Sequence, residues 1–125
     1  MDNAVREVLL SQGVNLEDAM HRFLDMEEMY IKFLVKYSEE KSIENMKNAL
    51  ETRDVETVFK SAHSYKGLAG NLGLERIYGM ASEVTELTRG KSNSDEVDFE
   101  LLAEKIAVLC TADNEMRETI RTYFC

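Results

Sequence analysis

Proline and tryptophan are both absent from this chain of 125 residues, and only two cysteines are present. Because proline lacks an amide proton and its ring clashes with the preceding helical turn, its absence favours long helices. Cys110 and Cys125 lie far apart and form no CxxC or Cys/His pair, so the sequence offers no zinc-ligand pattern. We expect reduced thiols, as in a cytoplasmic protein; a disulfide between the two is the alternative.

Long apolar segments and concentrated positive charge are missing as well. No stretch approaches the roughly 18 apolar residues of a membrane-spanning helix, and residues 1–13 lack the basic and apolar regions of a signal peptide. The net charge of −9 argues against nucleic acid as a main partner, because binding to a phosphate backbone needs clustered Lys and Arg. The sequence therefore predicts a cytoplasmic protein that binds neither membranes nor nucleic acid.

Turn residues and hydrophobic periodicity divide the chain into helices. Gly13 ends a short first helix, Asn15 caps a short second one, and Asp25 and Asp54 are the expected N-caps of longer helices. These longer helices are predicted from Glu27 past Ser42 to Leu50, from Val55 to Leu72, from Leu74 to Arg89, and from Val97 to Tyr123, with an interruption or kink at 111–114. Residues 90–96 form the one clear loop.

The fold class follows from this series of helices. Four long amphipathic helices with short connections predict an all-α protein, an antiparallel up-down-up-down four-helix bundle preceded by one or two short helices. A chain of this length fits one domain over residues 1–125, with an N-terminal helix in 1–14 and the helical bundle in 15–125.

The predicted helix 55–72 has an ordinary inner face and an unusual outer one. An apolar stripe with steps of three and four residues marks the face that packs into the core: Val58, Ala62, Tyr65, Ala69 and Leu72. His63 lies about 200° around the helix from Tyr65, so its side chain is expected to face solvent. A lone surface histidine is usually incidental, and its neighbours decide whether this one has a function.

Those neighbours are two glycines and a lysine on the outer face. Gly67 and Gly70 each cost about 1 kcal/mol relative to alanine inside a helix. We interpret both as clearance that lets a partner approach His63, the alternative being close helix packing. Lys66 lies one turn from His63, where its ammonium can stabilise a phosphoryl group on the imidazole; a simply solvated lysine is the alternative.

Residues 62–74, AHSYKGLAGNLGL, resemble the signature of histidine phosphotransfer (Hpt) domains, roughly AHxLKGxxxxxG. They match at the alanine, the histidine, the lysine and the two signature glycines, Gly67 and Gly73. Tyr65 departs from the pattern, since the family usually has an aliphatic residue there, and a buried tyrosine needs a partner for its hydroxyl. The resemblance extends over residues 15 to about 90.

The resemblance implies a four-helix bundle that accepts a phosphoryl group from a receiver-domain aspartate and relays it to another receiver in two-component signalling. His63 would be the phosphoacceptor, through Nε2, and Lys66 the cation beside it. Such domains usually have no kinase or phosphatase activity and no cofactor of their own; the divalent cation belongs to the receiver. The implied partners are response-regulator receivers and a hybrid histidine kinase, with this chain as a monomer.

In the family, the next helix often supplies a polar side chain that orients the histidine. Thr85 occupies the position where relatives carry Gln or Glu, and Ser82 and Glu86 are the alternates. Threonine is shorter, so a water is expected to mediate its contact. Phe59, one turn before His63, either anchors an apolar docking surface or folds back onto its own bundle.

Three other functions compete with a phosphocarrier. A histidine kinase fragment is excluded, because it would carry a proline shortly after the histidine and an ATP-binding domain beyond it. An adaptor that binds receivers without carrying phosphate would need neither His63 nor Lys66. A structural module would bury its glycine-rich face in a homodimer, which the mass in solution would reveal. The joint presence of His63 and Lys66 favours the phosphocarrier.

Overall fold

The computed structural model describes all residues from 1 to 125 and confirms the all-α prediction. It contains seven α-helices, one 3-10 helix and no strand. The helices are α1 (Asn3–Ser11), α2 (Leu16–Arg22), α3 (Glu27–Tyr37), α4 (Ser42–Glu51), α5 (Val55–Asn71), α6 (Glu75–Thr88), the 3-10 helix η1 (Ser94–Glu96) and α7 (Phe99–Phe124). No helix combines the length and the apolar composition that a transmembrane span requires.

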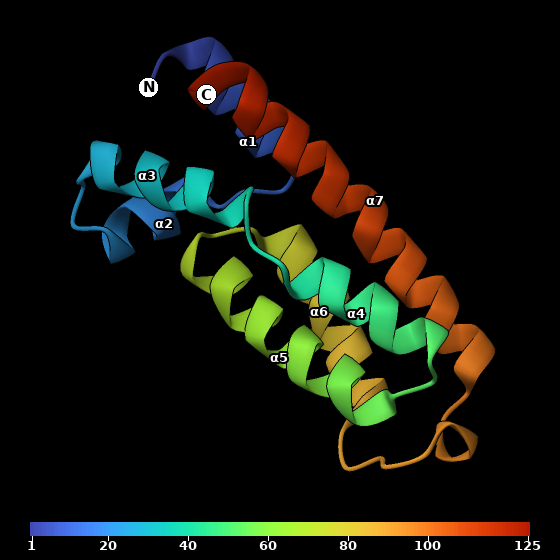
Figure 1. Cartoon of the computed structure of the whole chain (residues 1–125). Helices are drawn as coiled ribbons and strands as arrows, with labels where there is room; N and C mark the ends of the chain where they lie inside the picture. The colour runs from blue at the N-terminus through green and yellow to red at the C-terminus, as the bar shows by residue number, and fades with distance from the viewer.

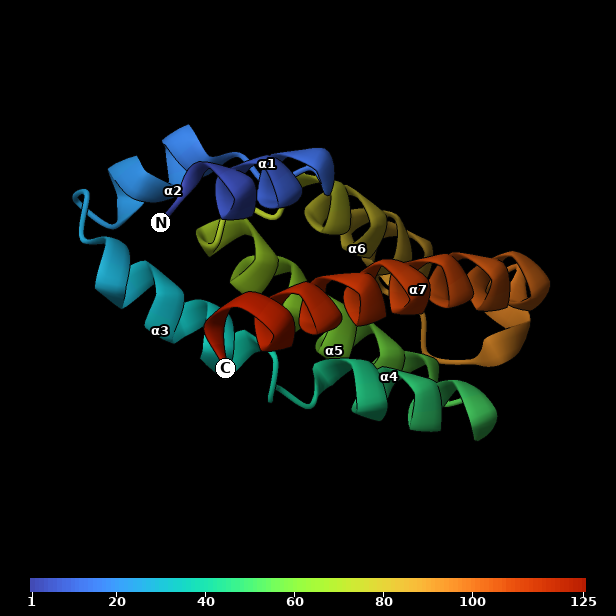
Figure 2. The same ribbon diagram turned by 90° about the horizontal axis from the view of Figure 1, so that it is seen from above.

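Helices α4, α5, α6 and α7 form the predicted bundle. Helix α5 packs between α4 and α6, and α7 closes the bundle against α6 and α4 (Figure 1). At 26 residues, α7 is longer than the other helices and continues past them to contact α1 and α3. Seen from above, α1, α2 and α3 gather at one end of the molecule, where both chain termini also lie (Figure 2).

The inner stripe predicted for α5 is confirmed. All five of its side chains are at most 1% exposed: Val58, Ala62, Tyr65, Ala69 and Leu72. They belong to a single cluster of 26 buried apolar residues contributed by the α-helices and their connections. This cluster fixes the rotation of α5 about its axis, and therefore decides which residues α5 turns towards solvent.

An N-cap residue and a glycine with positive φ fix where α5 begins and ends. Asp54 is the N-cap, as predicted: its carboxylate accepts from the backbone N–H of Thr57 at 3.1 Å and from the Thr57 hydroxyl at 2.6 Å. At the other end Gly73 has φ +73°, and a Cβ there would lie 2.7 Å from the carbonyl oxygen of Asn15. Only glycine fits this crossing, in which Asn15 N–H donates to the Gly73 carbonyl at 2.7 Å.

The predicted long helix from Glu27 to Leu50 is wrong, because the chain leaves the helical path between α3 and α4. Arg117 of α7 donates to the backbone carbonyls of Ser38 at 2.6 Å and Glu40 at 2.8 Å. These carbonyls thus bond to a side chain 79 and 77 residues away. The N-cap prediction nearby is also wrong, since Met26 occupies that position and Asp25 has a left-handed φ of 60°.

The predicted interruption of the last helix at 111–114 is also wrong, because α7 is continuous there. Asp113 faces the core and is only 1% exposed. The hydroxyls of Tyr37 and Tyr65 lie 2.7 and 2.6 Å from its Oδ1, and Arg117 Nε lies 2.7 Å from its Oδ2. Asp113 is therefore the hydrogen-bond partner that the buried Tyr65 hydroxyl needs.

Candidate functional site

The outward face of α5 carries the residues singled out from the sequence. His63 and Gly67 are exposed, and Lys66 and Gly70 are half-buried. We call these four residues the His63 face. The orientation follows from helix geometry, since the buried stripe occupies the opposite side of α5. The prediction that His63 points away from the core is therefore confirmed.

An aromatic stack lies next to the imidazole. The ring centroids of Phe59 and His63 are 5.7 Å apart, and the ring planes differ by 13°. The guanidinium of Arg89, at the end of α6, lies 5.3 Å from the Phe59 centroid. Arg89 also pairs with Glu86, at 3.0 Å from Nη2 to Oε1. Phe59 therefore contacts the candidate nucleophile on its own helix and a cation on the next one.

The Lys66 side chain reaches towards α6 without forming an ion pair. Its Nζ lies 5.9 Å from the centroid of the Tyr78 ring, and no carboxylate lies within 4 Å of it. The pKa of Glu86 is held below its ordinary value mainly by the hydrogen bond and charge of Arg89, with a smaller effect of Lys66. Since its charge is not neutralised by a close partner, the Lys66 ammonium is available to an anion held beside His63.

The two glycines of the His63 face differ in their surroundings. A Cβ at Gly67 would have no neighbour within 4 Å apart from its own turn of helix. A Cβ at Gly70 would lie 3.2 Å from the Tyr78 ring, tighter than an ordinary contact. Close packing therefore explains Gly70, which corrects its interpretation as clearance alone, whereas nothing in the protein's own packing requires Gly67.

The expected polar partner on α6 is not where the family resemblance suggested. Thr85 is fully buried, and its hydroxyl donates to the carbonyl of Ala81 at 2.8 Å. The prediction that Thr85 orients His63 is therefore wrong, because its buried hydroxyl is bonded within its own helix. The two alternates are more accessible: Ser82 is half-buried and Glu86 is exposed. None of the three forms a hydrogen bond with His63, so the imidazole has no polar partner on α6.

Two surface hollows lie beside α5 and were not predicted from the sequence. One lies between α5 and α6 and is lined in part by Gly67, Gly70 and Tyr78. The other has four apolar side chains, among them Phe33 and Leu68. Phe33 is 38% exposed and Tyr78 is 42% exposed. The exposure of Phe33 depends on how α3 packs in the folded chain, which the sequence does not show.

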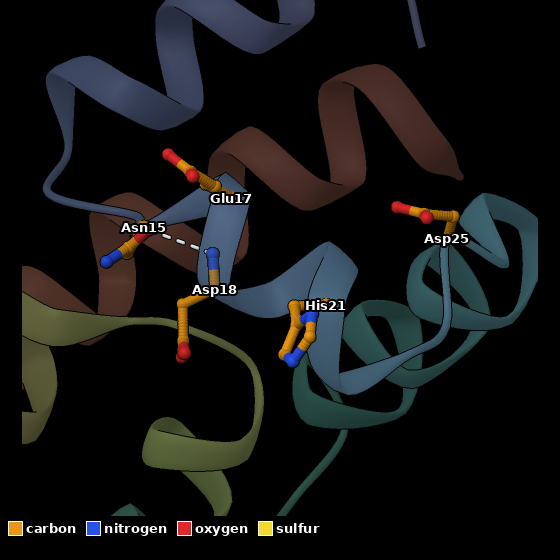
Figure 3. Close-up of a pocket in the computed structure, with 5 residues that line it drawn as sticks. All are labelled: Asn15, Glu17, Asp18, His21 and Asp25. Carbon is orange, nitrogen blue, oxygen red and sulfur yellow. Dashed lines mark hydrogen bonds between the residues drawn. The ribbon is translucent and has the colours of Figure 1, made fainter.

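A further hollow, on α2, has polar and acidic walls but no convergent site. Its lining residues are Asn15, Glu17, Asp18, His21 and Asp25, whose side chains spread around α2 in Figure 3. The Asn15 carboxamide accepts from the Asp18 N–H at 3.0 Å and donates to Glu75 at 2.9 Å. No group of His, Cys, Asp or Glu side chains in the chain is arranged to hold a metal ion.

Comparison with known proteins gives one finding that bears on this site. The sequence model of the Hpt domain matches residues 18–118, from α2 to the last turns of α7. The matched segment contains the whole of α5 and α6 and hence the entire His63 face. Neither the curated proteins nor the solved structures include a match.

Proposed function

This chain belongs to the Hpt domain family of phosphorelay proteins, and on that premise we propose that His63 is its phosphoacceptor. The phosphoryl group comes from the aspartyl phosphate of a response-regulator receiver domain and passes to the aspartate of another receiver. The observation that carries the proposal is an exposed imidazole beside an unpaired ammonium, Lys66, and a bare turn of helix at Gly67.

The transfer exchanges one bond for another. The lone pair on Nε2 of His63 attacks phosphorus, the bond from phosphorus to the aspartyl oxygen breaks, and the aspartate leaves as a carboxylate. The onward step is the reverse, with a second receiver's carboxylate as the attacking group. Neither step requires an oxidant, a nucleotide or a group beyond the two proteins and the metal ion of the receiver.

The electrostatic demands divide between the two proteins. Positioning and neutralisation of charge dominate phosphoryl transfer. Lys66 supplies a cation on this side, and a divalent cation on the receiver supplies the rest. The chain itself needs no cofactor in this scheme. It acts as a phosphocarrier without autonomous kinase activity, because the reacting phosphate always arrives already activated as an acyl phosphate.

The receiver must place its aspartate directly over His63, which makes the shape of the His63 face important. The absence of a side chain at Gly67 leaves open space one turn from the imidazole. The exposed rings of Phe33 and Tyr78 on the flanking helices offer apolar contacts to a docking partner. This requirement favours a monomer, since a homodimer through the same face would cover His63. A receiver and a hybrid histidine kinase are the partners we expect.

The decisive test is phosphoryl transfer from purified phosphorylated receiver domains of the same organism. Wild type should acquire a label that is acid-labile and base-stable, and His63→Gln should acquire none. His21→Gln is the matched control, because His21 is the only other histidine and lies on α2; it should be labelled like wild type. Failure of wild type to take label from any receiver of the organism would contradict the proposal and favour an adaptor.

A further inference from the structure

A transferring imidazole must be held in one orientation, because the Nε2 lone pair has to point along the line of attack. A side chain on an exposed helix face otherwise samples two common χ1 rotamers and a broad range of χ2. In this chain no hydrogen bond from the protein fixes His63, and the polar residue expected to orient it, Thr85, is buried and bonded within its own helix. Another contact is needed to order the ring.

The stacked contact with Phe59 fits this requirement. Nearly parallel planes, 13° apart, and a centroid separation of 5.7 Å are the geometry of an offset aromatic stack. Phe59 precedes His63 by four residues on the same helix, so the two side chains are neighbours, and the imidazole adopts the rotamer that stacks on the Phe59 ring. Contacts of this kind favour the stacked rotamer by a few-fold to about tenfold.

Phe59 is itself held in place from the neighbouring helix. The Arg89 guanidinium lies over its ring at 5.3 Å, and Arg89 in turn pairs with Glu86 on the last turn of α6. The ring is half-buried, so it lies against the bundle and does not project freely into solvent. The series Glu86, Arg89, Phe59, His63 thus connects α6 to the imidazole through stacking instead of a hydrogen bond.

We propose that Phe59 is a positioning residue for phosphoryl transfer: its ring orients the His63 imidazole, with Arg89 as the support that fixes the ring. This inference rests on the proposed phosphoacceptor role of His63. It assigns to an aromatic residue on α5 the task that a polar residue on α6 was expected to perform.

The first test is spectroscopic and needs no partner protein. With only two histidines, the carbon-bound imidazole protons of His63 and His21 give a simple NMR spectrum. Protons stacked on an aromatic face are shielded, so the His63 signals of wild type should lie upfield of those of His21. They should move towards the His21 positions in Phe59→Leu and stay upfield in Phe59→Tyr. His63 signals that coincide with His21 in wild type would overturn the stack without recourse to any variant.

The second test separates orientation from docking. At saturating phosphorylated receiver, Phe59→Leu should transfer about three- to tenfold more slowly than wild type, because the reactive rotamer is less populated. The receiver concentration that gives half the maximal rate should stay the same, and Phe59→Tyr should recover the wild-type rate. Tyr123→Leu, an aromatic replacement in the last turn of α7, is the matched control and should have no effect.

Each contrary outcome has a distinct meaning. A Phe59→Leu variant with the wild-type maximal rate overturns the positioning role, and a rise confined to the half-saturating receiver concentration makes Phe59 a docking residue instead. A wild-type chain that takes no label overturns the function of His63 itself, whatever the NMR spectra show. A labelled wild type with an unaffected Phe59→Leu therefore rejects this inference alone.

Discussion

Gly67 lies in the middle of a helix, where glycine is unfavourable, and no contact within the protein requires it. Gly67→Ala should therefore raise the free energy of unfolding by about 0.5–1 kcal/mol, because alanine has the higher helix propensity and its methyl group meets open space. Gly67→Gln should fold as well but transfer phosphate at least about tenfold more slowly, since a long side chain obstructs the approach to His63. Urea denaturation and the transfer assay measure the two effects.

Two other glycines provide the controls for this prediction. A methyl group added at Gly79 on α6 would also meet open space, so Gly79→Ala should gain stability by a similar amount without slowing transfer. Gly70→Ala should gain less or lose stability, because its methyl group would press on the Tyr78 ring at 3.2 Å. A normal transfer rate in Gly67→Gln would show that a partner's approach to His63 does not depend on the missing side chain at Gly67.

At the scale of single residues, the sequence was sufficient to predict which side chains of a helix face the core and which face solvent. The outward orientation of His63 and the inward one of Tyr65 follow from a period of about 3.6 residues, and both are confirmed. The orientation of Thr85 was not predictable in this way, because it depends on how α6 is rotated against α5. The Phe59 stack was also out of reach, since a side-chain rotamer depends on neighbours from another helix.

At the scale of helices, the break between α3 and α4 depends on one side chain. Arg117→Met removes the donor to two backbone carbonyls and leaves the buried carboxylate of Asp113 without its cation. We expect the free energy of unfolding to fall by about 3 kcal/mol, because an unpaired buried charge is costly. Equilibrium urea denaturation followed by circular dichroism measures the loss.

The matched control is a surface arginine. Arg76 pairs with Glu115 at 3.5 Å, and both side chains are about half exposed. Arg76→Met should cost less than about 1 kcal/mol, as exposed ion pairs usually do. Equal and small losses in the two variants would show that Arg117 does not hold the α3–α4 break.

The same arginine explains why the break was not predictable. The segment from Ser38 to Lys41 contains neither glycine nor proline, and the apolar periodicity continues across it. The bonds that stabilise the departure from helix come from a residue 77 to 79 positions later. Local propensity and spacing therefore predict one helix, and tertiary hydrogen bonds divide it into two.

At the scale of the whole molecule, buried tyrosines link stability to alkaline pH. Burial raises the pKa values of Tyr30, Tyr37 and Tyr65 above the ordinary value of 10.0. Each tyrosine ionises more readily in the unfolded chain, so its stabilising effect is complete below about pH 10 and is lost as the pH rises towards the folded-state pKa. The loss is about 1.4 kcal/mol per pH unit for each tyrosine.

Tyr30→Phe isolates one of these contributions. The variant loses the hydrogen bond from the hydroxyl to the Leu72 carbonyl, so at about pH 8 it should be less stable than wild type by about 1 kcal/mol. Above about pH 10 the difference should shrink by about 1.4 kcal/mol per pH unit and reverse near about pH 11. Denaturation curves at several pH values measure it, and a difference that stays constant across this range would contradict the assigned burial effect.

The bundle as a whole was predictable, because four amphipathic segments with short connections allow few arrangements, and the absence of proline agrees with them. The long reach of α7 was less predictable. Its polar segment at 111–114 looks like a turn in isolation. It stays helical because Asp113 finds two tyrosine hydroxyls and an arginine inside the protein.

The central claim is that His63 carries the phosphoryl group, and mapping the phosphorylated residue tests it most directly. The protein, phosphorylated by a receiver domain, would be digested at neutral or alkaline pH and its peptides sequenced by mass spectrometry. We predict one phosphorylated residue, His63, in the peptide that spans residues 61–66. Phosphate on His21, on a carboxylate or on a hydroxyl, with His63 unmodified, would contradict the claim.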